Sequence, residues 1–240
     1  MRGPALLGLL LVLGISAMCV RLGFWQLSRL EEKRELNRRR LAALEAPVLD
    51  LSSAAAFSGA VVGRRLRLSG VYDSLHHVLL RGRAHQGAPG VEVITPLRLA
   101  GRDDAVLVRR GWLPAPDATT ARPQDYAERG RVSVVGIAEE ARPVLGRVRV
   151  VVSRPGEGVT LLSVGQVALD SLRAQLPYPL VGFTLRQLPD PSLPPLPVRV
   201  APAPLNEGMH LSYAVQWFSF ALIILVGAVV LALRGRCDAT

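Results

Sequence analysis

The residues best suited to chemistry lie where the polar part of the chain enters its last apolar segment. His210 is followed, three and seven positions later, by Tyr213 and Trp217. On a helix these three side chains share one face. A neutral imidazole flanked by aromatic rings can ligate the metal of a flat, apolar macrocycle. The same residues can also anchor a helix at the headgroup level of a bilayer.

A second group of residues follows the first apolar segment of the chain. Its members lie along one side of a predicted helix, and they are Trp25, Gln26, Arg29 and Lys33. If both apolar segments cross a membrane, this group and His210 lie at the same interface. The cationic side chains would then neutralise the carboxylates of a bound haem, whose iron accepts an imidazole as axial ligand. The simpler alternative is an aromatic belt whose cations contact lipid phosphates.

Two uncharged segments predict the elements that position these residues. Leu211–Leu233 has 23 residues, so as a helix it spans about 35 Å and exceeds the roughly 30 Å of a hydrocarbon core. Pro4–Val20 is shorter, but its apolar run continues past a single arginine to Trp25. No clean signal-peptidase site follows this run, which favours a retained anchor over a cleaved signal peptide. We therefore predict transmembrane helices over 4–25 and 210–233.

Two spans place both ends of the chain, residues 1–3 and 234–240, on one side of the membrane and the long polar loop on the other. Charge alone leaves open which side is cytoplasmic. Arg234 and Arg236 favour a cytoplasmic C-terminus, whereas the basic cluster at 29–40 favours a cytoplasmic loop.

The two ends of the loop are predicted to connect the membrane spans to a central domain. A juxtamembrane helix over 26–46 continues the first span, and it is supported by the ion pairs Glu31/Arg34, Glu35/Arg38 and Glu35/Arg39. Proline at position 47 ends this helix. A proline-rich linker over 189–209, stiff and PPII-like, leads into the second span.

The loop between these connections, 47–188, is predicted to be one mostly β domain of the α+β class. Short β-branched runs bounded by turn-forming residues predict strands, and these lie at 64–70, 77–81, 91–97, 105–110, 131–137, 148–153 and 181–188. An apolar face at helical spacing predicts a helix over 163–176. The predicted fold is therefore an integral membrane protein with two transmembrane helices flanking this domain.

Composition and motifs argue against several other functions. The formal net charge is +10, but no nucleic-acid motif or aromatic-rich basic patch occurs, and binding to anionic lipid explains the basic segment. The histidines at 76, 77 and 85 lack further ligands for a metal site, so structural roles are expected. Neither a Gly-x-Ser-x-Gly elbow nor a P-loop is present, and no enzyme activity is expected. Cys19 and Cys237 fall on opposite sides of the membrane and cannot pair.

Motifs along nearly the whole chain resemble the SURF1 family. Leu22-Gly-Phe-Trp25-Gln-Leu-Ser-Arg29 resembles the segment after its first helix, and Val108-Arg-Arg110-Gly-Trp112-Leu-Pro114 is similar to its Arg-Gly-Trp-x-Pro signature. Two segments resemble the β domain of the family, and these are Gly70-Val-Tyr72-Asp73 and Gly90-Val-Glu-Val-Ile-Thr-Pro-Leu97. The entry into its second helix is similar to His210-Leu-Ser-Tyr213-Ala-Val-Gln-Trp217-Phe218. All these segments follow one another in the same order as in the family.

This resemblance implies an assembly factor for cytochrome c oxidase that binds haem a and helps to place it in the catalytic subunit, subunit I. Haem a synthase is a second candidate partner. The resemblance also implies a plasma-membrane location, with both termini cytoplasmic and the domain extracytoplasmic. His210 is then the expected axial ligand, and the haem site is expected to comprise Tyr213, Trp217, Trp25, Gln26, Arg29 and Lys33. Trp112 is expected to brace the β domain, and Arg110 to contact a partner.

The chain departs from the family pattern beside the candidate ligand. Glu207-Gly-Met209 separates Asn206 from His210, and Gln216 stands where threonine is frequent. Two other functions stay open at this point. One is a haem-free scaffold that holds oxidase subunits, and the other is a membrane-anchored enzyme acting through the β domain.

Overall fold

The computed structural model describes residues 3–51, 61–141, 148–156, 158–202 and 205–237. Two compact units emerge from the packing. The first is helical and combines Met1–Leu41 with Pro204–Thr240, and the second, Ala42–Ala203, holds the β domain.

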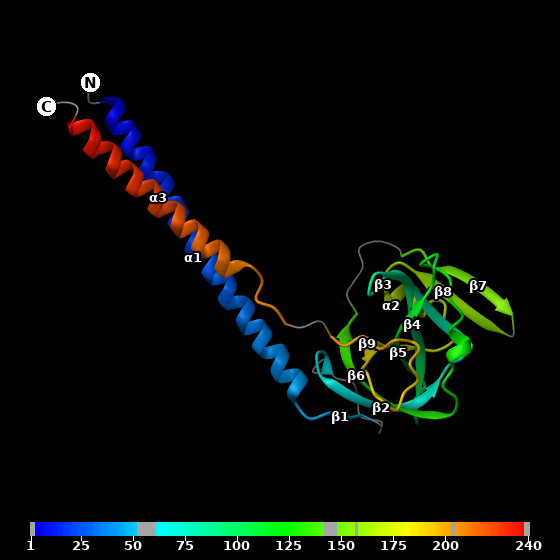
Figure 1. The fold of residues 1–240 in the computed structure, drawn as a ribbon. Coiled ribbons are helices and arrows are strands. Elements are labelled where there is room, and N and C mark those ends of the chain that lie inside the picture. Colours follow the sequence, from blue (N-terminus) through cyan, green and yellow to red (C-terminus); the bar gives the residue numbers. More distant parts are fainter. Residues whose placement is uncertain (1–2, 52–60, 142–147, 157, 203–204, 238–240) are drawn as a thin grey trace. The chain divides into compact units, whose positions relative to one another are not determined.

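The helical unit consists of two helices that run side by side (Figure 1). α1 (Gly3–Glu45) is continuous from the first apolar segment through the predicted juxtamembrane helix, and α3 (His210–Cys237) contains the second apolar segment. Both are long and apolar enough to cross a membrane. The beginning of α1 and the end of α3 lie at the same end of the pair (Figure 1). The fold therefore combines two apolar helices with a mostly β domain, as the sequence predicted.

Small side chains line the contact between these helices. Ser16, Cys19, Ala214 and Ala221 are buried, and such residues let two backbones approach closely where lipid surrounds a helix pair. The rings of Phe24 and Phe218 add an edge-to-face contact, with centroids 5.3 Å apart. The pairing fixes which face of each helix meets the other.

The β domain is built on one sheet. Over the described residues it has nine strands in the order β1-β2-β6-β9-β5-β4-β3-β8-β7. The strands are β1 (Leu49–Asp50), β2 (Arg65–Tyr72), β3 (His76–His85), β4 (Ala88–Leu99), β5 (Ala105–Pro114), β6 (Arg131–Glu140), β7 (Val151–Gly156), β8 (Val159–Val164) and β9 (Leu180–Gln187). A 3-10 helix, η2 (Pro123–Tyr126), and a short helix, α2 (Leu169–Arg173), complete it.

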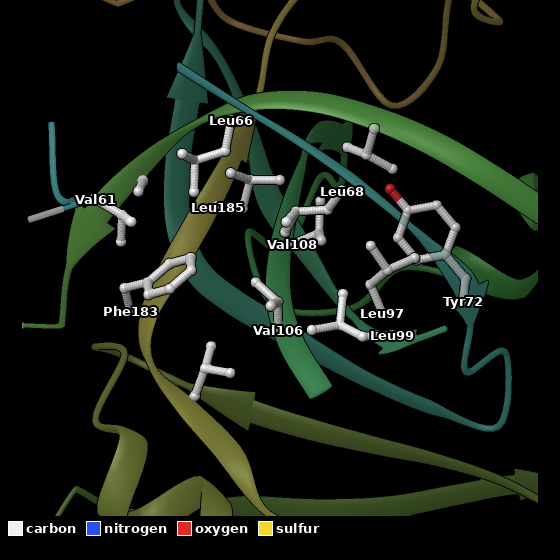
Figure 2. Packing of buried hydrophobic residues seen from close by; sticks show 13 residues of the cluster. Val61, Leu66, Leu68, Tyr72, Leu97, Leu99, Val106, Val108, Phe183 and Leu185 are labelled. Atoms are coloured by element: carbon white, nitrogen blue, oxygen red, sulfur yellow. The ribbon is translucent and has the colours of Figure 1, made fainter. Parts of the chain in front are cut away.

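Five of these strands close into a ring. Besides its pairing with β6, β2 pairs antiparallel with the end of β4, so the ring runs β2-β6-β9-β5-β4 and back to β2. The closing pairs are Gly70 with Leu99, Val71 with Arg98, and Tyr72 with Leu97. The inward side chains of the ring form one apolar core, which includes Leu66, Leu68, Val108, Phe183 and Leu185 (Figure 2).

Pro96 marks the point where β4 changes its partner. On one edge β4 pairs with β5 from Gly90 to Arg98. On the other edge it pairs with β3 up to Ile94 and then with β2 from Leu97 onward. Proline has no N–H for a ladder, so it fits the gap between the two partners. Its carbonyl still accepts a hydrogen bond from Asp73 N–H, at 2.8 Å.

The predicted helix over 163–176 is wrong for most of its length. Val164 ends β8, which pairs parallel with β3, and the only helical residues in that range are Leu169–Arg173. Val164, Leu172 and Leu176 are nevertheless buried in one cluster. The apolar spacing reflects a strand end, a short helix and a loop that share one core, and it imitates the period of a longer helix.

Candidate functional site

The candidate ligand His210 begins α3 and faces α1. Its ring nitrogen Nδ1 lies 2.9 Å from the side-chain oxygen Oε1 of Gln26. An amide oxygen only accepts, so Nδ1 carries the proton and donates it. A neutral imidazole has one N–H, so Nε2 keeps a lone pair for a metal. Within the described part of the chain, Nε2 has no hydrogen-bond partner.

Gly208 keeps the Nε2 edge of the ring open. Its backbone has φ +73°, a left-handed conformation that glycine adopts at little cost. A Cβ atom at this position would lie 3.5 Å from Cδ2 and 3.7 Å from Nε2 of His210. Such a Cβ would be in ordinary van der Waals contact with this edge of the ring, and glycine leaves the edge uncovered. The sequence showed this glycine only as part of a departure from the family pattern.

The segment before His210 is held by polar side chains of α1. Arg34 donates two hydrogen bonds to the carboxylate of Glu207, each 2.9 Å long, in place of its predicted helical pairing with Glu31. The hydrogen bond from Arg34 lowers the pKa of Glu207. Asn37 Nδ2 donates to the carbonyl of Asn206, at 2.8 Å. The sequence analysis did not predict these contacts. The only signal in the sequence was a single acid, Glu207, close to the membrane end of a loop whose other end is the basic segment 29–40.

The predicted aromatic residues remain accessible. Tyr213 is 43% exposed and Trp25 is 49% exposed. Trp217 is half-buried, and its ring meets Phe220 edge to face at 5.9 Å. The guanidinium of Arg29 lies 5.6 Å from the ring centroid of Trp25.

The structure thus brings some of the predicted residues together and separates others. Gln26 and His210 meet directly across the two helices. Trp25 and Arg29 form a separate pair on α1, and Arg29 also binds Glu32 at 2.7 Å. Lys33 is half-buried on the same helix. The arrangement offers one nitrogen ligand beside exposed aromatic rings, which suits a haem better than a bare ion, because a macrocycle supplies the remaining ligands.

The histidines of the β domain have structural partners. His77 is 1% exposed, and its two ring nitrogens contact Thr95 Oγ1 and the carbonyl of Ser74, each at 3.0 Å. Burial, helped by the charge of Arg110, lowers its pKa to about 4. His76 contacts Asp73 at 2.8 Å. Over the residues that the structure describes, His, Cys, Asp and Glu side chains form no group of three that could hold a metal ion.

The prediction that Arg110 contacts a partner is wrong. Its side chain is 1% exposed, and its Nη2 donates to Glu128 Oε1 at 2.8 Å and to the carbonyl of Tyr126 at 2.6 Å. Its guanidinium also lies 4.9 Å from the ring centroid of Tyr72. Arginine is rarely this buried, and here the carboxylate and the ring compensate for the lost water. Trp112 braces the domain as predicted, because its Nε1 donates to the carbonyl of Arg83 at 3.2 Å.

Comparison with known proteins decides the family of this chain. The SURF1 family model matches residues 13–222. The chain belongs to the SURF1 family. A SURF1-like protein of Monosiga brevicollis is 27% identical over 93% of this chain and 87% of its own length. A SURF1-like protein of Rickettsia felis is 30% identical over 43% of this chain and 45% of its own. The SURF1 match includes the whole of the loop between the two apolar helices.

Proposed function

We propose that this SURF1-family protein assists the assembly of cytochrome c oxidase by holding haem a at the membrane surface for delivery to subunit I. The observation that carries the proposal is the imidazole of His210. It begins a helix that is apolar enough to span a membrane, and its Nε2 is unpartnered among the described residues. A neutral imidazole with a free nitrogen is the usual axial ligand of haem iron.

The neighbouring residues fit the other parts of a haem. Tyr213 and Trp217, three and seven residues into the same helix, offer aromatic surface beside the ligand. Arg29 and Lys33 carry the positive charge that haem carboxylates require. The iron is cargo in this proposal, and the protein has a binding role and not a catalytic one. A single axial bond holds the haem weakly enough for transfer to a stronger site.

The proposed location is the plasma membrane, with both termini cytoplasmic and the β domain extracytoplasmic. The antiparallel packing of the two helices, which puts the beginning of α1 beside the end of α3, supports a common side for the termini. Haem a synthase is proposed as the donor of the haem. The alternative is a haem-free scaffold that holds oxidase subunits while His210 only supports the helix pair.

The test is haem content after expression in a host that makes haem a. The full-length protein is purified in mild detergent, and its pyridine haemochrome spectrum is compared with those of His210→Ala and His85→Ala. Haem a is expected in the wild type and in His85→Ala, and its loss is expected in His210→Ala. Haem in all three proteins would mean that a residue other than His210 is the axial ligand. Absence of haem from all three, at matched expression, would favour the scaffold.

A further inference from the structure

We infer that Gln26 is a positioning residue that sets the tautomer of His210 and thereby presents Nε2 to the ligand. The inference rests on the proposed function for its biological purpose, but the hydrogen bond itself stands on the structure alone. Gln26 and His210 lie 184 residues apart in the chain and 2.9 Å apart in space. No other side chain in the described residues makes a hydrogen bond to this imidazole.

The packing of α1 against α3 fixes the amide in place. Gln26 is half-buried and lies between Gly23 and Leu30, which are buried on the same face of α1. The ring of Phe218 on α3 lies over Gly23, where an added Cβ would approach it to 2.6 Å. The side chain of Gln26 therefore projects at the level where α3 begins. Its oxygen meets Nδ1 without a rearrangement of either helix.

The amide decides which nitrogen is available. The nitrogen that carries the proton in a neutral imidazole is set by the hydrogen bond that the ring makes. Because the amide oxygen of Gln26 accepts the hydrogen bond from Nδ1–H, the lone pair of the imidazole is on Nε2. Nε2 lies on the edge of the ring that Gly208 leaves open. A carboxylate at this position would raise the basicity of the imidazole and strengthen its bond to a metal. A neutral amide orients the ring and keeps the bond modest, which suits a site that must release its cargo.

The first test examines the protein without haem. Full-length protein carrying 15N-labelled histidine is studied in detergent above pH 8, and the His210 signals are assigned by their loss in His210→Ala. The proton is expected on Nδ1 in the wild type and in Gln26→Glu. In Gln26→Leu the population is expected to shift toward the Nε2–H form. Gln216→Leu, the same substitution at an exposed glutamine of α3, serves as the matched control and is expected to leave the tautomer unchanged.

Two results would overturn the inference. One is a wild-type His210 with its proton on Nε2, which would mean that the amide of Gln26 is turned round and donates. The other is an unchanged tautomer in Gln26→Leu. Either result can be obtained whether or not the protein binds haem.

The second test measures the haem-loaded protein and separates the two proposals. Gln26→Leu is expected to weaken haem binding by about tenfold or more, as loss of a partner behind a metal-binding histidine commonly does. Gln26→Glu is expected to retain haem and lower its midpoint potential. A tautomer that responds to Gln26, together with a wild-type protein that takes up no haem in the expression test, would uphold the positioning role and reject the proposed function. If the protein binds haem but neither haem retention nor the midpoint potential changes in the Gln26 variants, the proposed function is upheld and the positioning role is rejected.

Discussion

Trp112 and Val198 exchange both of their backbone hydrogen bonds. The N–H of Trp112 donates to the carbonyl of Val198 at 2.9 Å, and the N–H of Val198 donates back at 2.8 Å. The proline-rich segment, which the sequence predicted to be a stiff, PPII-like linker, therefore pairs with β5 at this point. Arg199, the next residue, binds Glu128 at 2.9 Å and extends the attachment.

Gly111 should tolerate no side chain beside this contact. Its φ is +137°, and a Cβ would lie 2.3 Å from the carbonyl oxygen of Val198. Gly111→Ala is expected to lower the free energy of unfolding by about 2 kcal/mol or more beyond the cost of backbone strain. Gly130→Ala is the control, because that glycine has φ +79° and open space around its Cβ position. Equal losses of thermal stability in the two variants would refute the steric explanation.

Glu128 should be essential to the stability of the β domain. It accepts hydrogen bonds from Arg110 and Arg199, whose side chains are 1% and 4% exposed. Glu128→Gln leaves two buried cations without a counter-charge, so a loss of about 3–5 kcal/mol is expected in urea unfolding. Asp125→Asn removes an exposed ion pair with Arg122 and should cost less than about 1 kcal/mol. A tolerant Glu128→Gln variant would show that the two arginines find another partner.

His77 should make the β domain less stable in acid. Burial lowers its folded-state pKa to about 4, below the roughly 6.5 of an unfolded chain. The unfolded state therefore binds the proton first, and stability falls as the pH drops through this window. Between pH 7 and pH 5 the wild type should lose about 2 kcal/mol more than His77→Gln. Urea unfolding of both full-length proteins at the two pH values measures this difference, and parallel losses would exclude His77 as the cause.

The ion pair between Arg34 and Glu207 should hold the segment before His210. Arg34→Glu places two acids together and is expected to increase the mobility of a nitroxide spin label attached at position 205. The double variant Arg34→Glu, Glu207→Arg should restore the lower mobility, because the pair is re-formed with reversed signs. A label that stays mobile in the double variant would mean that the contact depends on more than charge.

The sequence was most informative where one face of a strand is buried. β2 alternates regularly, with Leu66, Leu68, Gly70 and Tyr72 buried and the alternate residues more accessible, and this period of two predicts a strand directly. Ring closure was not predictable, because it depends on pairs such as Gly70 with Leu99 that no local pattern reports. The false helix at 163–176 arose because residues of different elements share one core.

The candidate site was predictable as a set of residue types but not as a geometry. His210 stood out by its position at the start of an apolar helix, and Gln26 by its place beside Trp25. The sequence did not reveal that Gln26 faces His210 while Trp25 lies beside Arg29, because each side chain's direction depends on the packing of the helix pair. Arg110 was misjudged because arginine is usually exposed, and its burial depends on the distant acid Glu128.

The position of β9 sets the moment at which the domain can fold. Among the strands that the structure describes it is the last to be synthesised, yet it lies between β6 and β5, where it closes the ring that the β2–β4 pairing joins on the other side. A nascent chain that ends before β9 can already pair β6 with β2, β2 with β4 and β4 with β5, but its ring stays open between β6 and β5 and its core lacks Phe183 and Leu185. Part of its apolar surface therefore stays uncovered as it leaves the ribosome. Closure of the ring must wait for almost the entire loop to emerge. Gln187 ends β9 and His210 begins α3, so only 22 residues lie between this strand and the second apolar helix. The domain therefore has little time to fold before its second anchor is inserted.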